Sequence, residues 1–438
     1  MTSAYDPAAE VAEICRDLIR IDTTNFGDGS GPGERSAAEH VAALLAEVGI
    51  ESQLFEAAPG RASVVAQWGG AGTGDGPDER LLVHGHLDVV PAAAADWKVD
   101  PFSGEVADGY LWGRGAVDMK DFDAAILSVV RARARAGAPP RRPLTLAFTA
   151  DEEAGSRFGA HRLVDERPEW FAGCTEAIGE VGGFSTTVGD RRVYLVQTAE
   201  KGIAWLRLRA HGTAGHGSMR NVDNAVTALA EAVSAIGRHE WPVRMTPAMH
   251  QLLEAVAALT GHESPYDDVD ALLAHFGPAA RMLAAVVRNS ANPTMLASGY
   301  KHNVIPGEAT AAIDGRFLPG YEDEFFETLR GLLPDSVSYE ILVHETALQT
   351  TFDGALVDAM QAAILAADPD ADVLPFLMPG GTDAKAWSRL GIRCFGFSPL
   401  RLPPDLDFTA LFHGVDERVP LGALEFSARV FDDFLDRA

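Results

Sequence analysis

An apolar run that leads into histidine or carboxylate residues recurs along this chain, and this pattern most constrains its fold. The run LLVHGHLD occupies residues 81–88, and LTLAFT at 144–149 is followed by DEE at 151–153. Glu180 comes directly after a third run, EAIG at 176–179. An open α/β sheet presents its ligand-binding edge where its strands end. The sequence therefore predicts an α/β fold with a ligand site at one edge of the sheet.

The residues at these positions are of the kinds that bind divalent metals. Imidazole and carboxylate groups together suit zinc or another borderline cation. Five such candidates occur: His86, Asp118, Glu153, Glu180 and His413. Alone, each has an ordinary explanation, because most histidines are hydrogen-bonded surface or core groups and acidic pairs are usual at solvated turns or helix N-termini. Five ligands with Glu152 left over nevertheless match what a two-metal hydrolase needs.

Four segments together carry a family resemblance. HGHLDVVP at 84–91, GRGAVDMK at 113–120, DEE at 151–153 and GTAGHGS at 212–218 resemble the dinuclear zinc M20 metallopeptidases. That family includes aminoacylase, acetylornithine deacetylase, succinyl-diaminopimelate desuccinylase and glutamate carboxypeptidase. The resemblance follows the family's order over nearly the whole chain. The turn GEVGGFS at 179–185 is similar to the carboxypeptidase S-like branch.

The resemblance implies that each chain holds two zinc ions, although cobalt or manganese suits similar ligands. Asp118 would bridge the two ions. His86 and Glu180 would complete one site. Glu153 and His413 would complete the other.

The resemblance also implies roles for two neighbouring carboxylates. Glu152 would be the general base, taking a proton from a water that two cations acidify and passing it to the leaving amine. Asp88 would accept the second N–H of the His86 ring and so support catalysis by fixing its tautomer. A cis peptide bond is expected between Asp118 and Met119.

His216 lies in a glycine-rich turn, Gly215-His216-Gly217. A histidine that merely tolerates a turn conformation fits this sequence equally well. In the resembled family the matching histidine reaches into the active site of the partner subunit and stabilises the tetrahedral oxyanion. The resemblance therefore implies a catalytic His216 and a homodimer.

Further residues resemble the family's substrate contacts. Asn303 resembles a second polar contact, and Arg316 resembles a clamp for a free carboxylate, a task suited to the planar guanidinium. A surface ion pair of Arg316 with Asp314 or Asp323 is the alternative. Three residues resemble a loop whose backbone amides approach the substrate: Gly380, Gly381 and Thr382. An ordinary tight turn also accounts for them.

Length and charge limit the kind of protein. The chain has 438 residues, of which 47% are hydrophobic, so it can bury a large core and favours two domains. Its formal charge of −27 repels phosphate backbones, which argues against nucleic acid as a partner. Apolar runs fall short of the roughly 20 residues of a membrane span, and the first ten residues lack a signal pattern. We therefore expect no membrane partner and a cytoplasmic location.

The pattern of elements divides the chain. Helices are expected from Pro7, at 34–48, at 121–136 and at 221–236, and a flexible loop at 69–78. Alternating strands are expected at 203–211 and 309–317. We expect a mixed-sheet α/β zinc-peptidase catalytic domain formed by residues 1–199 and 319–438. Residues 200–318 are expected to form an inserted, smaller α+β lid and dimerisation domain.

The sequence thus predicts a metal-dependent hydrolase that cleaves an amide or peptide bond next to a free carboxylate. Candidate substrates are the C-terminal bond of a peptide, a dipeptide or an N-acyl amino acid. Three alternatives stay open: a non-catalytic metal- or peptide-binding protein of the same fold, a mononuclear aminopeptidase-like enzyme, and a carbamoyl or ureido amidohydrolase. Side-chain specificity is not encoded in any motif.

Overall fold

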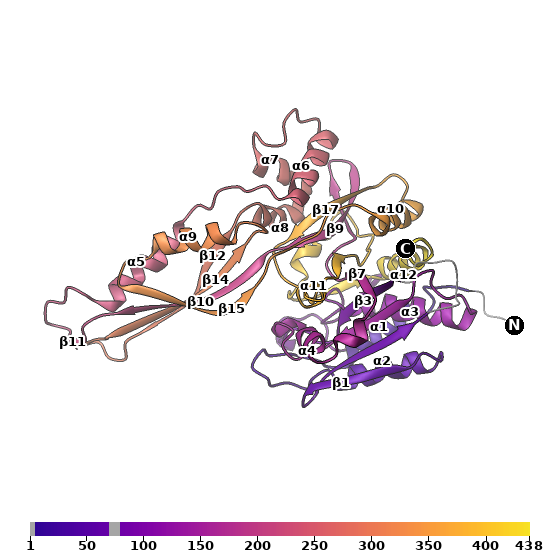
Figure 1. The fold of residues 1–438 in the computed structure, drawn as a ribbon, viewed down its shortest axis with the longest axis horizontal. Coiled ribbons are helices and arrows are strands. Elements are labelled where there is room, and N and C mark those ends of the chain that lie inside the picture. Colours follow the sequence, from indigo (N-terminus) through magenta and orange to yellow (C-terminus); the bar gives the residue numbers. More distant parts are fainter. Residues whose placement is uncertain (1–4, 70–78) are drawn as a thin grey trace.

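The computed structural model describes residues 5–69 and 79–438, which form a larger body and an elongated arm (Figure 1). The body carries the C-terminus, and the arm extends away from it. The loop predicted at 69–78 lies outside the described residues, apart from Gly69.

A mixed sheet of ten strands forms the centre of the body. Its main path runs in the order β1 (Ser52–Ala58), β2 (Arg61–Trp68), β6 (Leu144–Thr149), β3 (Arg80–His86), β7 (Cys174–Gly179), β18 (Arg393–Gly396), β9 (Arg191–Glu200) and β16 (Leu348–Gln349). Two more strands, β8 (Phe184–Val188) and β17 (Asp372–Met378), pair with β9. The four central strands β6, β3, β7 and β18 are parallel to one another. The flanking pairs β1–β2, β2–β6 and β18–β9 are antiparallel. The expected mixed α/β fold is confirmed.

Helices cover both faces of this sheet, and that explains its near-continuous apolar strands. Leu81 and Val83 of β3 join one core, whereas Leu82 joins another, because successive side chains point to opposite faces. Helices sharing the first core are α1 (Val11–Arg20), α2 (Arg35–Ala46), α3 (Lys120–Ala136), α6 (Pro247–Thr260), α10 (Ala355–Ala367) and α12 (Leu421–Arg437). Helices α4 (Ala160–Glu166) and α11 (Ala384–Ser388) contribute to the second.

Two of the first three helices follow the sequence pattern closely, and the first begins later than predicted. α2 and α3 lie within one or two residues of the predicted 34–48 and 121–136, and Gly137 ends α3 in the left-handed conformation (φ 65°). α1 begins at Val11 rather than at Pro7. Asp6 accepts the Ala8 N–H as a cap does, but the residues that follow form a turn before the helix.

The arm is a four-stranded antiparallel sheet with two helices along one face (Figure 1). Its strand order is β12 (Ser290–Ser298), β14 (Glu308–Phe317), β10 (Gly202–His211) and β15 (Val337–Glu345). Its helices are α5 (Ala225–Arg238) and α9 (Glu322–Leu332). β11 (Gly215–His216) and β13 (Val304–Ile305) form a small pair at the tip. β10 and β14 match the two predicted strands.

The residues that form the core of the arm do not coincide with the insertion expected at 200–318. Phe325 of α9 and Val337 of β15 join the core that Leu206 of β10 contributes to, so the chain leaves the arm only after Glu345. Conversely, α6 and the short helices α7 (Val269–Leu273) and α8 (Ala280–Ala284) pack with the body. The boundary at 318 is therefore corrected, because β15 pairs with the free edge of β10.

Helix α5 also begins later than the predicted 221. The Asn224 side chain accepts the N–H groups of Val226 and Thr227, which makes it the N-cap. Asn221 instead donates a hydrogen bond to the carbonyl of Thr213. Several polar residues precede this helix, and the sequence pattern did not distinguish the cap among them.

Within residues 5–69 and 79–438, one segment, Val269–Val287, is long and apolar enough to cross a membrane by length and composition. It is not a continuous helix, because Gly277 has non-helical angles (φ 57°, ψ −123°) and Pro278 follows it. Pro lacks the N–H that a helix interior needs. The segment is therefore a broken helical stretch, and it is the exception to the expected absence of long apolar runs.

Candidate functional site

Three neighbouring parallel strands bring the candidate ligands together at one sheet edge. His86 is the last residue of β3 and lies beside Thr149, the last residue of β6. Glu152 and Glu153 follow β6 in a 3-10 turn, and Glu180 directly follows β7. The carboxyl ends of parallel strands meet at the same edge, which explains why ligands separated by almost a hundred residues converge.

The remaining two ligands come from segments that approach this edge. Asp118 lies just before α3, and the Asp118–Met119 peptide bond is cis, as the resemblance implied. His413 lies in the loop before β19 (Arg418–Pro420), with φ 57°. β19 pairs with β5 (Tyr110–Trp112), which also pairs with β4 (Glu105–Ala107). This small sheet brings the loop of His413 beside the segment of Asp118.

The five side chains form two clusters that share Asp118. His86 Nε2 lies 3.1 Å from Asp118 Oδ1 and 3.4 Å from Glu180 Oε2. His413 Nε2 lies 3.2 Å from Asp118 Oδ2 and 3.0 Å from Glu153 Oε2. In each cluster the ligand atoms are all within 4.8 Å of one another. The two oxygens of Asp118 thus face different histidines, as a bridging carboxylate requires.

The donor set fits a pair of divalent cations. Glu153 Oε1 is buried and has no hydrogen-bond partner among the described residues. Burial, and then the nearby charge of Asp118, raise the pKa of Glu153. Three carboxylates and two imidazoles in two clusters that share Asp118 suit zinc chemistry, and cations would offset the repulsion among the carboxylates.

The nearby carboxylates raise the pKa values of both histidines. Burial alone would lower the pKa of His86, but the charge of Glu180 and the hydrogen bond to Asp118 outweigh it and raise the pKa well above its usual value. Hydrogen bonds to Asp118 and Glu153 raise the pKa of His413 to about 10. Both rings therefore lie in a strongly negative field, which would equally attract a bound cation.

Glu152 lies beside the clusters without belonging to either. Its Oε2 is 4.0 Å from His86 Nε2. Burial, together with the charge of Glu180, raises its pKa well above the usual value. Its side chain lines the cavity described below. Glu152 is therefore a carboxylate that can exchange a proton with a molecule in the cavity.

Asp88 supports the site differently from the expectation. His86 Nδ1–H donates to the Asp88 carbonyl at 3.0 Å, whereas the Asp88 carboxylate is 3.6 Å away. The carboxylate instead accepts the N–H groups of Glu152 (3.0 Å) and Glu153 (3.1 Å). The backbone of Asp88 fixes the ring, and its side chain holds the turn that carries the two glutamates.

The contacts of two polar residues around the site, Asn25 and Arg114, were not predicted. Asn25 donates one side-chain hydrogen bond to Asp88 and another to Asp151, so it links the segments after β3 and β6. Arg114 forms a buried ion pair with Glu417, and it also donates to the carbonyl of Gly414, next to His413. Single polar residues without a motif carried no signal for either contact.

A cavity of about 1450 Å³ adjoins the clusters, between the body and the open face of the arm sheet. Four of the predicted substrate contacts line it: Arg316, Gly380, Gly381 and Thr382. Arg316 also forms the ion pair that was the alternative explanation, with Nε 2.7 Å from Asp314 Oδ1 and Nη2 3.2 Å from Oδ2. Its Nη1 has no hydrogen-bond partner among the described residues.

The loop at Gly380 to Thr382 is tied to the junction of body and arm. Thr382 donates hydrogen bonds to the buried carboxylate of Glu200 through both Oγ1 (2.6 Å) and N–H (3.2 Å). Lys385 Nζ donates to the carbonyls of Lys201 and Thr346, each at 2.8 Å. These carbonyls lie where the chain first enters the arm, before β10, and where it finally leaves the arm, after β15. The sequence pattern did not indicate Lys385.

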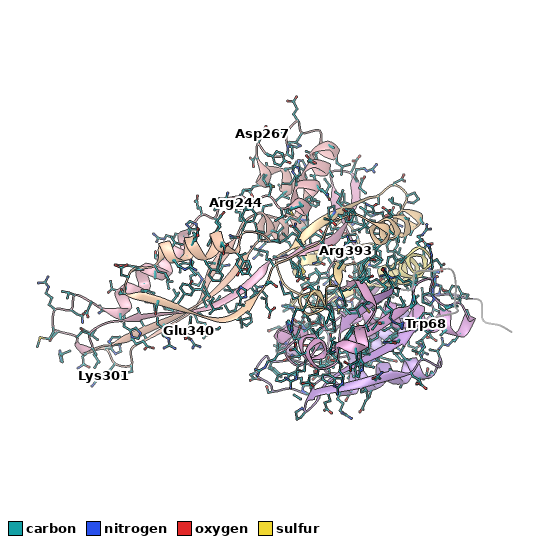
Figure 2. All side chains as sticks on the ribbon, viewed as in Figure 1. Trp68, Arg244, Asp267, Lys301, Glu340 and Arg393 are labelled. Atoms are coloured by element: carbon teal, nitrogen blue, oxygen red, sulfur yellow. The ribbon has the colours of Figure 1, made fainter. Side chains whose placement is uncertain are left out.

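His216 and Asn303 are not brought to the cavity of their own chain. Both lie at the tip of the arm, where the Gly217 N–H donates to the Asn303 carbonyl. His216 is exposed and contacts Ser218. Figure 2 shows this tip at Lys301, at the far end of the arm from the body.

The chain is similar to known proteins along most of its length. The model of "Peptidase family M20/M25/M40" matches residues 82–437. The chain is 27% identical to N-fatty-acyl-amino acid synthase/hydrolase PM20D1 of Xenopus tropicalis, over 96% of this chain and 84% of the relative. It is 29% identical to probable carboxypeptidase S-like 2 of Dictyostelium discoideum, over 82% of this chain and 71% of the relative. The fold resembles the M20 family metallo-carboxypeptidase Sso-CP2 from Sulfolobus solfataricus, with a TM-score of 0.72 at 17% identity, covering 98% of this chain and 99% of that one.

Proposed function

This chain belongs to peptidase family M20/M25/M40, and we propose that it is a metal-dependent hydrolase of amide or peptide bonds next to a free carboxylate. The observation that carries the proposal is the pair of ligand clusters sharing Asp118, with Glu152 beside them in the same cavity. Suitable substrates are the C-terminal bond of a peptide, a dipeptide or an N-acyl amino acid, classes that fit the names of its relatives.

Five residues would hold two divalent cations, for which we propose zinc. His86 and Glu180 would hold one, Glu153 and His413 the other, and Asp118 would contact both. Bound cations of this kind acidify water and polarise a carbonyl group. No member of either cluster is then free to accept a proton. Glu152 is the carboxylate that remains available.

The chain's own groups account for the proton transfers. The Glu152 carboxylate accepts a proton from the attacking water and delivers it to the nitrogen of the leaving amine. Asp88 holds the Glu152 backbone N–H, so this carboxylate stays at the edge of the cavity. The free Nη1 of Arg316 can donate to the substrate's carboxylate while Asp314 holds the rest of the guanidinium.

Zinc-loaded protein is expected to hydrolyse N-acyl amino acids or dipeptides, and to hydrolyse their C-terminally amidated counterparts at least about tenfold less efficiently, because a charge-assisted hydrogen bond is lost. Chelation should remove the activity and added zinc should restore it. Product release by chromatography measures both effects. A panel that includes N-carbamoyl amino acids separates ureido from amide hydrolysis. A protein that binds metal but cleaves none of these compounds is the non-catalytic alternative.

We also propose that the active unit is a homodimer in which the arm tip of one chain supplies His216 and Asn303 to the other. His216 is exposed at the tip and does not line its own cavity. Three large apolar side chains near the tip are mostly exposed, namely Met219 (69%), Val222 (83%) and Tyr300 (84%). Exposed apolar patches of this kind mark contact surfaces.

Mixing two inactive variants is expected to restore activity if His216 acts across subunits. The variants His216→Asn and Glu152→Gln are each defective, but a heterodimer contains one cavity with both native residues. Random subunit exchange should therefore recover about one quarter of wild-type activity. Activity after mixing and size-exclusion chromatography are the measurements. No recovery from variants shown to exchange subunits would place His216 outside the partner's site.

A further inference from the structure

The open face of the arm sheet presents an apolar wall to the cavity. β10 alternates, so Ala204 and Leu206 are buried in the arm core while Ile203 and Trp205 point to the opposite face. Both Ile203 and Trp205 line the cavity. The side chain of Trp205 is 46% exposed, although tryptophan is usually well buried. Trp205 thus offers its indole ring to a molecule in the cavity.

This wall lies directly beside Arg316. In the antiparallel register of β10 and β14, Ile203 is opposite Arg316 and Trp205 is opposite Asp314. Opposed residues share a face, with Cβ atoms about 4.5–5.5 Å apart. The backbone hydrogen bonds of one sheet fix this spacing. Among the described residues, no cation–π contact places the guanidinium of Arg316 over the indole ring, so the ring remains accessible.

We propose that Trp205, with Ile203, binds the side chain of the substrate residue that bears the free carboxylate, and selects an apolar or aromatic side chain there. This inference rests on the proposed function, in which Arg316 binds that carboxylate. The same α-carbon carries the carboxylate and the side chain. A carboxylate at Arg316 therefore places the side chain within a few ångströms of the wall.

The charged residues beside the apolar wall favour a substrate side chain that carries no charge. Asp314 is already paired with Arg316. Glu345, opposite Ile203 on β15, lies 3.6 Å from the His161 ring. These two carboxylates repel an acidic side chain and have partners of their own, and Ile203 and Trp205 are the apolar contacts that lie opposite them. Trp205 is accordingly a specificity-determining residue rather than a catalytic one.

The test compares substrates that differ only in the carboxylate-bearing residue. N-acetyl derivatives of phenylalanine, leucine, lysine, glutamate and glycine, and the matching alanyl dipeptides, are assayed for kcat/KM. Wild-type protein should prefer phenylalanine over glycine by about 10- to 200-fold. Trp205→Ala should reduce this ratio about tenfold by lowering turnover of the phenylalanine substrate, while the glycine substrate changes less than about twofold. Trp205→Phe should retain most of the preference.

Ile341→Ala is the matched control. Ile341 is as exposed as Trp205 (47% against 46%) and lies on the adjacent strand β15, but it does not line the cavity. This variant should keep the wild-type ratio. An equal loss of activity on every substrate in Trp205→Ala, an unchanged ratio, or a wild-type preference for lysine or glutamate would overturn the inference.

Binding measurements keep the inference separate from the proposed function. Calorimetry with the Glu152→Gln variant gives the affinity for the same N-acetyl amino acids without turnover. In Glu152→Gln, the phenylalanine compound should bind more tightly than the glycine compound, and Trp205→Ala in the same background should abolish this difference. That result supports the apolar wall even if the wild-type chain hydrolyses none of the compounds. In that case only the proposed function fails. Binding that does not discriminate between phenylalanine and glycine, or no binding at all, overturns the inference.

Discussion

Glu152→Gln is expected to lower kcat by about 10³- to 10⁴-fold while the protein keeps its metal. The amide has nearly the same shape as the carboxylate but cannot accept a proton. Glu152 belongs to neither ligand cluster, and the hydrogen bond that holds its turn comes from its backbone N–H, which the substitution preserves. Steady-state kinetics and metal analysis by mass spectrometry measure the two effects on one sample.

The neighbouring residue provides the control for this prediction. Glu153 lies in the same 3-10 turn and its N–H also donates to Asp88, but its side chain is part of a ligand cluster. Glu153→Gln should therefore lose metal, and its lost activity should partly return at high zinc concentration. If Glu152→Gln kept its turnover, or lost metal as Glu153→Gln does, the assignment of Glu152 as the base would be wrong.

Asp118→Ala is expected to lower the metal content from about two ions per chain to less than one, because Asp118 belongs to both clusters. Glu180 belongs to only one cluster, so Glu180→Ala should leave about one ion per chain. Metal content after dialysis against a dilute chelator measures this difference.

Asp165→Asn is a suitable control for the metal measurements. Asp165 is a carboxylate that lines the same cavity but belongs to neither cluster. It pairs with Arg389 at an exposed position, so its loss should cost little stability. This variant should retain both ions. Equal metal content in Asp118→Ala and wild-type protein would exclude Asp118 as a shared ligand.

Local patterns predicted the elements that position the site. β3 and β6 are almost wholly buried, β7 is buried over its last three residues, and each strand ends at or just before its candidate ligands. Helix α3 ends at Gly137 because a residue without a side chain adopts the left-handed conformation easily. Signals of this kind lie within a few neighbouring residues, so they are visible before folding.

The predictions were wrong where the structure of a segment depends on residues far away in the sequence. The return from the arm was predicted at residue 318, but β15 extends the arm sheet to Glu345 by pairing with β10, more than a hundred residues earlier. The role expected for the Asp88 carboxylate was wrong in detail, because Asp88 is recruited by the turn after β6 rather than by the nearby His86.

The sequence by itself determined which side chains are available for metal binding and proton transfer, because strand ends and short motifs carry that information locally. Only the tertiary structure decided which residues share a cavity. It joined Arg114 to Glu417, tied Lys385 to the first entry into the arm and to the last exit from it, set Trp205 beside Arg316, and left His216 of β11 at the distant tip. The physical reason is that these contacts join segments far apart in the chain, and strand register and helix packing alone bring them together.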